Sequence, residues 1–479
     1  MSGATLTIGG AFNSHVGIVS VPSSFLGDTS STSGSLNSLL ENYLVSLTSS
    51  IQGSSTTGAT YAFENNDVAA GPGNDFVTAP ASGSFSGSLE EFTNTDSVGG
   101  VTSTSVNGAY TVSSGVTDVV VQAPGNVTLA GNDSTNFALF GASSNVNYTQ
   151  SIGGSASIVA AGGNNAINIT ATNVNDTVHS SGNDTVTFNG TGGQNVVNAE
   201  GNATTAVFVG GSDAATVTAS DSAAASVTFI PGSGGSLEFI NNSTQAQTVY
   251  SGTYATESGG TVYAPNSITV NAGAGGGIYV GGRAGNNSLI GGAGAVTMVG
   301  GGTSDVLVGN GSSSALFGGT GLETLIGATG SGNNLFAIGL NYPGIGQLTA
   351  SGIVSTNGSG VQNFVIGNTN GETITGSNAS GSTNLYDIIG SNSGGETTGG
   401  STLTITNFGS NANNYIALVD GTLAGQSDTS IYSIEGAGGP GGGTDVYLND
   451  GTTILLKGIN AANVGTIAGG NGVVFITHQ

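Results

Sequence analysis

The chain has 479 residues and a formal net charge of −25, because 27 acidic residues are opposed by one lysine and one arginine. Two cationic side chains cannot neutralise a phosphate backbone or hold the chain on an anionic lipid surface, which excludes nucleic acids and anionic membranes as partners. Cysteine is absent and no apolar run approaches the roughly 20 residues of a spanning helix, which excludes disulfides, thiol chemistry and membrane insertion.

The rest of the composition is typical of a repeat protein. Glycine accounts for 87 of the 479 residues, which is about 18% of the chain, whereas its usual share is about 7%. Hydrophobic residues make up 37% of the chain, and this content, with a small charge per residue, favours a folded chain over a disordered one. Glycine does not recur at every third position, which excludes collagen.

The first predicted element is an amphipathic helix over residues 35–52. Its apolar residues follow the i, i+3, i+4, i+7 spacing of one helix face: Leu36, Leu39, Leu40, Tyr43, Leu44, Leu47 and Ile51. This face either caps the first coils of a β-structure or docks onto another subunit. The residues before it have no basic stretch followed by an apolar run, so they do not predict a secretory signal peptide.

Glycine-rich turns and evenly spaced valines follow the helix. Three turns, at residues 71–77, 131–137 and 181–188, place Asp75, Asp133 and Asp184 directly after Gly-Asn. An aspartate in such a turn is expected to bond the nearby backbone. Strand centres then recur every ten or eleven residues and predict an irregular β-solenoid: Val186, Val196, Val207, Val217 and Val227.

Five consecutive nonapeptides between residues 282 and 326 form the clearest repeat. Every unit opens with glycine, which permits the positive φ of a tight turn, and ends in a short apolar strand. The eighth positions, which we expect to point inward, are Leu289, Met298, Leu307, Leu316 and Leu325. Two units predict one coil of 18 residues that stacks on the next coil through parallel strand pairing.

This pattern resembles the GGxGxDxUx nonapeptide of RTX calcium-binding β-roll proteins. In that family the sixth-position aspartates of alternate units hold Ca²⁺ between turns. The sixth positions here are Asn287, Asp305 and Glu323 in one column, and Val296 and Ser314 in the other. The resemblance therefore implies a weakened calcium column on one edge of the roll and a lost column on the other.

The same resemblance extends to both ends of the repeat region. It makes Asp75, Asp133 and Asp184 further candidate Ca²⁺ ligands, as the alternative to turn residues. Residues 403–418 resemble the segment that closes RTX rolls in type I secretion substrates. Amides replace several of the family's acids there, while the apolar positions match at Ile405, Phe408, Ile416 and Leu418.

Residues 444–460 predict a β-hairpin around the turn Asn449-Asp450-Gly451. A strand–DGTT–strand segment followed by VVFIT is similar to the uncleaved C-terminal export region of type I substrates. The resemblance implies export in one step by the type I secretion machinery, which needs no N-terminal signal.

No catalytic constellation is apparent. His15, His179 and His478 are isolated, and there is no H-E-x-x-H, G-x-S-x-G or Walker motif. The glycine-rich run at 273–282 lies within the β-repeat and is not a dinucleotide loop. A pair of carboxylates could still hydrolyse a polysaccharide, as such pairs do in glycoside hydrolases. The candidates are Glu90 with Glu91, whose side chains would point to opposite faces of a strand, and Asp445 with Asp450. We therefore expect no enzymatic activity.

The sequence predicts an all-β fold, a β-solenoid or β-roll of glycine-rich repeats with one short N-terminal helix. The expected segments are an N-terminal region (1–65), an irregular solenoid (66–272), a regular nonapeptide roll (273–340), a second irregular solenoid (341–402), and a C-terminal β cap with the export region (403–479).

The leading functional hypothesis is a secreted structural protein that forms a surface layer or extracellular fibre as a homopolymer, with Ca²⁺ assisting folding or assembly. This hypothesis locates the protein outside the cell or at its surface. The alternative is an adhesin or biofilm-matrix protein that binds cell-surface polysaccharide.

Overall fold

The computed structural model describes residues 5–8, 17–20, 62–65, 74–78 and 89–92, and most of residues 108–479. Within the last range it leaves out 113–117, 122–124, 132, 134, 142–143, 161, 202, 220–224, 232–235, 252–253, 256–260, 263–266, 283–285, 320, 341–348, 390–399, 410–412, 420–430, 438–441 and 470–472. The predicted helix at 35–52 lies outside the described residues.

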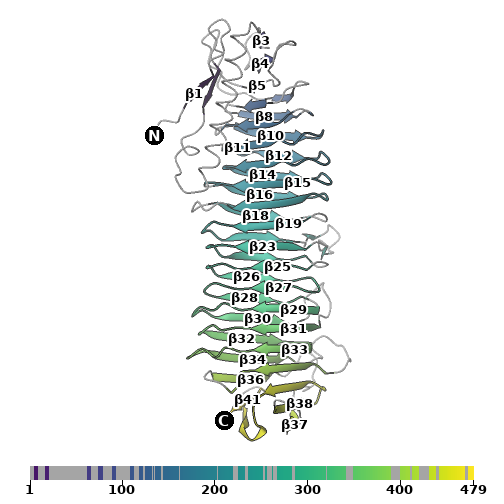
Figure 1. Cartoon of the computed structure of the whole chain (residues 1–479), viewed down its shortest axis with the longest axis vertical. Coiled ribbons are helices and arrows are strands. Elements are labelled where there is room, and N and C mark those ends of the chain that lie inside the picture. The colour runs from purple at the N-terminus through teal and green to yellow at the C-terminus, as the bar shows by residue number, and fades with distance from the viewer. Residues whose placement is uncertain are drawn as a thin grey trace. The chain divides into compact units, whose positions relative to one another are not determined.

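The chain divides into two compact units, Met1–Gln245 and Ala246–Gln479, and within each unit the strands stack as successive rungs (Figure 1). In the first unit the even-numbered strands form a parallel sheet: β6 (Gly108–Thr111), β8 (Gly125–Ala130), β10 (Ser144–Gln150), β12 (Ala166–Ile169), β14 (Asn183–Phe188), β16 (Thr204–Val209) and β18 (Ser226–Ile230).

The odd-numbered strands of the first unit form a second parallel sheet: β5 (Leu89–Phe92), β7 (Asp118–Val121), β9 (Phe137–Phe140), β11 (Ser157–Ala160), β13 (Thr177–Ser180), β15 (Gln194–Ala199), β17 (Ala214–Ala219) and β19 (Leu237–Asn241). Strands β3 (Ala62–Asn65) and β4 (Asn74–Thr78) extend it in antiparallel pairing. Strands β1 (Thr5–Ile8) and β2 (Gly17–Ser20) pair separately.

The second unit repeats this arrangement. Its even-numbered sheet contains β20 (Gln247–Tyr250), β24 (Gly277–Val280), β26 (Val296–Val299), β28 (Ser314–Phe317), β30 (Asn334–Ile338), β32 (Val361–Ile366), β34 (Thr383–Ile389) and β36 (Asn413–Val419), all parallel. Its odd-numbered sheet contains β23 (Ile268–Ala272), β25 (Ser288–Ile290), β27 (Val306–Val308), β29 (Gly321–Ile326), β31 (Ala350–Ser355), β33 (Asn370–Thr375), β35 (Thr402–Thr406) and β39 (Thr453–Lys457), also parallel. A short pair, β21 (Tyr254–Ala255) and β22 (Thr261–Val262), lies outside both sheets.

Antiparallel strands end both sheets of the second unit. Strand β41 (Val474–His478) pairs with β36, and β40 (Val464–Ala468) pairs with β41 after the 3₁₀ turn Ala461–Asn463. Strand β38 (Gly443–Leu448) joins β39 through the turn at Asn449-Asp450-Gly451, and β37 (Ile431–Gly436) pairs with β38. The predicted hairpin is confirmed, and Gly451 has the positive φ of +85° that its turn requires.

The nonapeptide prediction is confirmed in detail. Leu289, Leu307 and Leu325 are aligned on successive odd-numbered strands, Met298 and Leu316 are aligned on even-numbered strands, and all five side chains are fully buried. Two nonapeptides therefore make one coil, whose apolar side chains are buried only because neighbouring coils stack about 4.8 Å apart. The expected β-solenoid is the observed fold.

The first unit is less regular, as its longer spacings predicted. The five predicted strand centres all lie within strands β14 to β18; Val186, Val207, Val217 and Val227 are buried, whereas Val196 is half-buried. Its neighbour Val197 points inward instead, in line with the buried Asn195 and Ala199. Because side chains alternate along a strand, a shift of one residue exchanges the two faces, and a Val-Val pair does not reveal which is inward.

Candidate functional site

Polar residues occupy the first inward position of many strands, where each strand leaves its turn. We call the resulting stacks polar columns. On even-numbered strands they comprise Asn165, Asp184 and Thr205 in the first unit and Ser314, Asn334, Gln362, Asn384 and Asn414 in the second. On odd-numbered strands they comprise Asp176 and Asn195 in the first unit and Asn287, Asp305, Glu323 and Glu372 in the second. All of these side chains are buried.

Asp305 connects its own turn to the preceding coil. Its Oδ1 accepts hydrogen bonds from the backbone N–H of Asn287, at 2.9 Å, and from Nδ2 of the same residue, at 2.8 Å. Its Oδ2 accepts the N–H groups of Gly301 and Gly302, each at 2.8 Å. Four donors thus surround one buried carboxylate, which stabilises both the turn and the stacking of two coils.

Asp184 repeats this arrangement in the first unit. Its Oδ1 accepts from the N–H of Asn165 at 3.1 Å and from its Nδ2 at 2.8 Å, while Oδ2 accepts from Ser180 Oγ at 2.7 Å and from Gly182 N–H at 3.3 Å. Burial raises the pKa of Asp184, and the hydrogen bonds from Ser180, Asn165 and Gly182 oppose that rise. An asparagine one coil before an aspartate is therefore a recurring structural step.

The even-numbered column of the second unit is neutral. Ser314 Oγ donates to Asn334 Oδ1 at 2.6 Å, and Asn334 Nδ2 donates to Gln362 Oε1 at 2.7 Å. Further along, Asn384 Nδ2 donates to Asn414 Oδ1 at 2.7 Å. The column at Ser314 has no charged ligand, as the sequence predicted, and amide side chains continue it over four more strands.

Glu323 and Glu372 have carboxyl oxygens without good hydrogen bonds. Both oxygens of Glu323 and Oε2 of Glu372 are buried and make no hydrogen bond of good geometry in the described part of the chain. Burial, followed by the charges of Asp305 and Glu372, raises the pKa of Glu323 to about 8, and the nearby Gly319 N–H opposes this only weakly. Burial raises the pKa of Glu372 to about 7. Only Gly352 separates the two glutamates in the column.

Asp176 and Asp213 form a comparable pair in the first unit. Oδ1 of Asp176 accepts from Ala156 N–H at 2.6 Å and Oδ1 of Asp213 from Gly193 N–H at 2.8 Å. Oδ2 of each aspartate and Nδ2 of Asn195 are buried without a partner among the described atoms. Burial raises the pKa of Asp176 to about 6, with the Ala156 hydrogen bond opposing this rise and the charge of Asp213 adding to it.

The predicted calcium column of Asn287, Asp305 and Glu323 lies along the odd-numbered strands of the second unit. Oδ1 of Asn287 accepts from the N–H groups of Ile268 and Gly282, so Asn287 and Asp305 already direct their oxygens at N–H donors. Ca²⁺ takes six to eight oxygen ligands. A cation in this column would rely first on Glu323 and Glu372, because both carboxyl oxygens of Glu323 and Oε2 of Glu372 are buried without a hydrogen bond of good geometry among the described residues. The described residues contain no cluster of three or more His, Asp or Glu suited to a metal. Calcium binding at the column stays a prediction.

The structure does not bring the other predicted ligands together. Asp75 lies on β4, opposite Asn65 of β3 and Glu91 of β5. Asp133 is exposed in the turn after β8, and Asp184 lies inside the solenoid on β14. Only Asp184, of these three aspartates, belongs to a polar column.

The carboxylate pairs considered for hydrolysis occupy different settings. Glu90 and Glu91 are successive residues of β5, opposite Phe76 and Asp75. Asp445 lies within β38 opposite Glu435, whereas Asp450 lies in the following turn, where its Oδ1 accepts from Thr452 N–H at 2.8 Å. Asp450 therefore makes the turn-type hydrogen bond expected of a lone aspartate.

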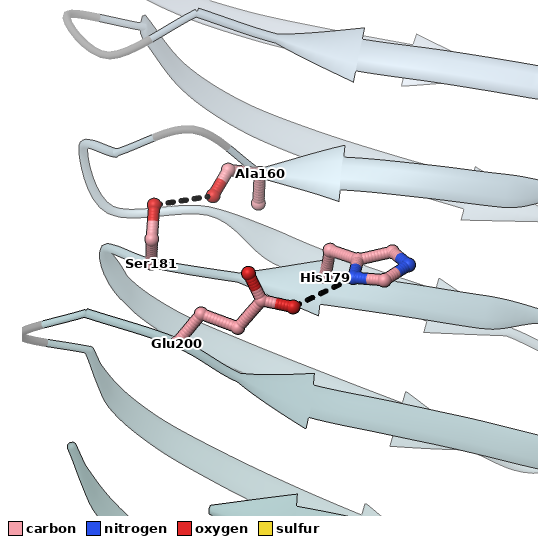
Figure 2. Close-up of polar contacts among 4 residues, drawn as sticks. All are labelled: Ala160, His179, Ser181 and Glu200. Carbon is pink, nitrogen blue, oxygen red and sulfur yellow. Dashed lines mark hydrogen bonds and ion pairs between the residues drawn. The ribbon is translucent and has the colours of Figure 1, made fainter. Parts of the chain in front are cut away.

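His179 lies on the outward side of β13 and contacts the next rung. Figure 2 shows its ring directed at Glu200, with 2.9 Å between His179 Nδ1 and Glu200 Oε1. Beside it, Ser181 Oγ donates to the carbonyl oxygen of Ala160 at 3.3 Å. These contacts join neighbouring coils on the outward side of the sheet, where His179 is buried, and the His179–Glu200 pair is ionic only while the imidazole is protonated.

Aromatic rings stack through the interior of the second unit. Ring centroids of Phe336 and Phe364, and of Phe364 and Tyr386, are 4.8 Å apart with an interplanar angle of 8° in each pair. Phe408 follows Tyr386 at 6.2 Å. The matched spacing shows that one ring per coil is held at the rung separation of the sheets.

No family model matches the chain, and no curated protein or solved structure matches it either. Among the described residues, no helix has the length and apolar character needed to cross a membrane.

Sequence reasoning missed several of the buried polar residues. Asp176, Asp213 and Glu372 lie outside the nonapeptide window and were not proposed as site residues. The sequence did contain a signal for one of these columns. Asp176 and Asn195 are 19 residues apart, which is close to the length of one coil and predicts that they stack. Glu372 comes 49 residues after Glu323 in the sequence, which is not a whole number of 18-residue coils, so spacing alone could not relate the two glutamates.

Proposed function

We propose that this protein is a secreted structural protein that assembles with copies of itself into a surface layer or an extracellular fibre. The observation that carries the proposal is the outward face of the odd-numbered sheet in the second unit. From β23 to β35, no described strand residue on that face is charged. Soluble proteins usually intersperse charged side chains of both signs over their surface, so an uncharged sheet surface favours contacts between copies.

The extracellular location and the export route rest on the resemblance to RTX proteins at 282–326 and 403–460. We propose that the type I secretion machinery exports the chain and that Ca²⁺ assists folding or assembly. Scarcity of lysine and arginine supports an extracellular material over a cytosolic protein. The proposal assigns no catalytic activity to the chain.

Electron microscopy of the purified protein, combined with light scattering from pH 4 to 8 with and without Ca²⁺, tests assembly. A net charge of −25 makes copies repel at neutral pH and low salt. We expect larger particles when carboxylates are protonated or cations are bound, and slower assembly with a chelator. A particle of 46.2 kDa under every condition would refute the structural-polymer proposal.

Rows of outward hydroxyl groups favour the second candidate, an adhesin or biofilm-matrix protein that binds surface polysaccharide. Thr373 and Thr375 of β33 lie beside Thr404 and Thr406 of β35, and Thr406 Oγ1 donates to Thr375 Oγ1 at 2.8 Å. Evenly spaced hydroxyls can bond the hydroxyls of a glycan chain. Retention of the monomer on immobilised cell-surface polysaccharide would favour this function.

A further inference from the structure

We propose that two copies of this chain pack face to face through an apolar patch on the outward side of the odd-numbered sheet in the second unit. This inference rests on the proposed function and names one contact within the assembly. The patch consists of Ile290, Val306, Val308, Leu322, Ile326 and Ile353.

The patch is continuous across four neighbouring strands. Val308 is aligned with Ile290 on one side and with Ile326 on the other, so three apolar residues form a row across β25, β27 and β29. Val306 and Ile353 flank Thr324 in the adjacent outward row. Interior packing does not explain these side chains, because they lie on the face opposite the buried Leu289, Leu307, Leu325 and Val354 of the same strands.

Several patch residues are strongly exposed for their type. Leu322 is 67% exposed, Ile353 54%, Val306 39% and Ile326 36%. Single exposed apolar residues are common on soluble proteins, but a contiguous group on one flat face indicates an interaction surface. The regular backbone beneath the patch presents these side chains at fixed rung spacing, which favours a partner with the same spacing.

Charge favours a second copy over a different protein. The chain has 27 acidic residues, so a different protein would bind it most strongly by placing cationic groups against those acids. The described strand residues of this face include no acidic residue for such a partner to contact. Two copies that both carry a charge of −25 can approach closely only where acids are absent. The outward residues from Thr269 to Thr406 on this sheet meet that condition. Among the described strands of this sheet in the second unit, outward charges resume on the C-terminal strands, at Glu435, Asp445 and Lys457.

The size of the face suits a contact that recurs in a polymer. Six strands spaced about 4.8 Å apart, from β25 to β35, provide roughly 500 Å² of flat surface. A specific complex usually takes about 800 Å² from each partner. A single pair through this face is therefore weak, and its strength in an assembly comes from many simultaneous contacts.

Cross-linking tests the contact, and the absence of native cysteine makes single-cysteine variants selective. Facing sheets lie about 10 Å apart, beyond the reach of a disulfide, so the probe is a short bismaleimide. We expect the Leu322→Cys and Ile353→Cys variants to give covalent dimers under assembling conditions. The control is Ile467→Cys, because Ile467 is 57% exposed and lies on the other sheet; it should give no dimers.

Charge repulsion gives an independent test. The double variant Leu322→Glu/Ile353→Glu places acids opposite acids across the contact and should weaken association at least tenfold. Ile152→Glu/Ile467→Glu adds the same charge at residues that are 58% and 57% exposed, and it should associate as the wild type does. Sedimentation velocity measures both, and circular dichroism checks that each variant is folded.

The outcomes separate this contact from the proposed function. If the wild type assembles but both double variants assemble equally and the patch cysteines do not cross-link, this face is not the contact and the proposed function stands. A wild type that stays monomeric throughout overturns both proposals. Cross-linking of the patch cysteines to a different protein, and never to a second copy, also overturns the inference.

Discussion

Asp305 Oδ1 accepts both the backbone N–H and the side-chain amide of Asn287, the residue one coil before it. These two positions were predicted to share a column because they are 18 residues apart. The structure adds that the column lies inside the solenoid and that its aspartate connects one turn to the next.

Replacing Asp305 with alanine should destabilise the second unit by about 3–5 kcal/mol, because four buried donors would lose their acceptor. Thr324→Ala is the matched control, since Thr324 lies on the outward side of the next strand and should change stability by less than about 0.5 kcal/mol. Urea denaturation followed by circular dichroism measures both. Equal effects would show that the hydrogen bonds of Asp305 contribute little.

Stability should fall as the pH rises from about 4.5 to 8. The folded-state pKa of Glu323 is raised to about 8 and that of Glu372 to about 7, so the folded chain binds more protons than the unfolded chain in this window. Unfolding therefore becomes easier with increasing pH. The Glu323→Gln variant should melt at a higher temperature than the wild type at pH 9 and at nearly the same temperature at pH 4. Melting curves recorded in a chelator separate this effect from metal binding, and a pH-independent difference would contradict it.

The stacked ring of Phe364 should be among the most costly residues to truncate. Phe364→Ala removes the middle member of a stack with 4.8 Å contacts on both sides and should cost about 3–5 kcal/mol. Phe364→Leu should cost less, because it retains apolar volume while losing the ring contacts. Denaturant midpoints compare the two variants, and a loss below about 1 kcal/mol for alanine would mean that neighbouring coils collapse into the space.

Calcium should raise the melting temperature modestly, since the odd-numbered column retains one aspartate, two glutamates and one asparagine in place of complete aspartate columns. Glu323→Gln and Asp305→Asn should both reduce this increase. Ser314→Ala is an imperfect control, because Ser314 Oγ donates to Asn334, so Thr324→Ala is preferable. Melting curves with calcium and with a chelator check the prediction, and no calcium effect would show a purely structural column.

The C-terminal region is expected to direct export. Deletion of residues 440–479 should keep the chain inside the cell, although it also removes β39, which pairs with β35. Fusion of residues 440–479 to an unrelated carrier avoids this complication and should carry it out through a type I system. Immunoblots of cells and medium provide the measurement, and an unexported carrier would contradict the resemblance to type I substrates.

The amino-acid sequence by itself determined the coil. Glycine at each turn and one apolar residue per nonapeptide predicted a stack whose period, inward Leu307 and Leu325, and closing hairpin all agree with the structure. These features follow from local backbone geometry and from the alternation of side chains along a strand. Both depend only on residues that are close to one another in the sequence.

Tertiary structure decided which polar residues meet and what they do. Val196 and Val197 were indistinguishable until the pairing of β15 set their faces, and Glu372 shares a column with Glu323 only through the pairing of β31 with β29 and with β33. The sixth-position Asp305 resembles a metal ligand in sequence, yet in the fold it accepts four N–H groups. Hydrogen-bond partners and burial depend on the register between coils, which is a property of the stacked sheets and is not encoded within any single repeat.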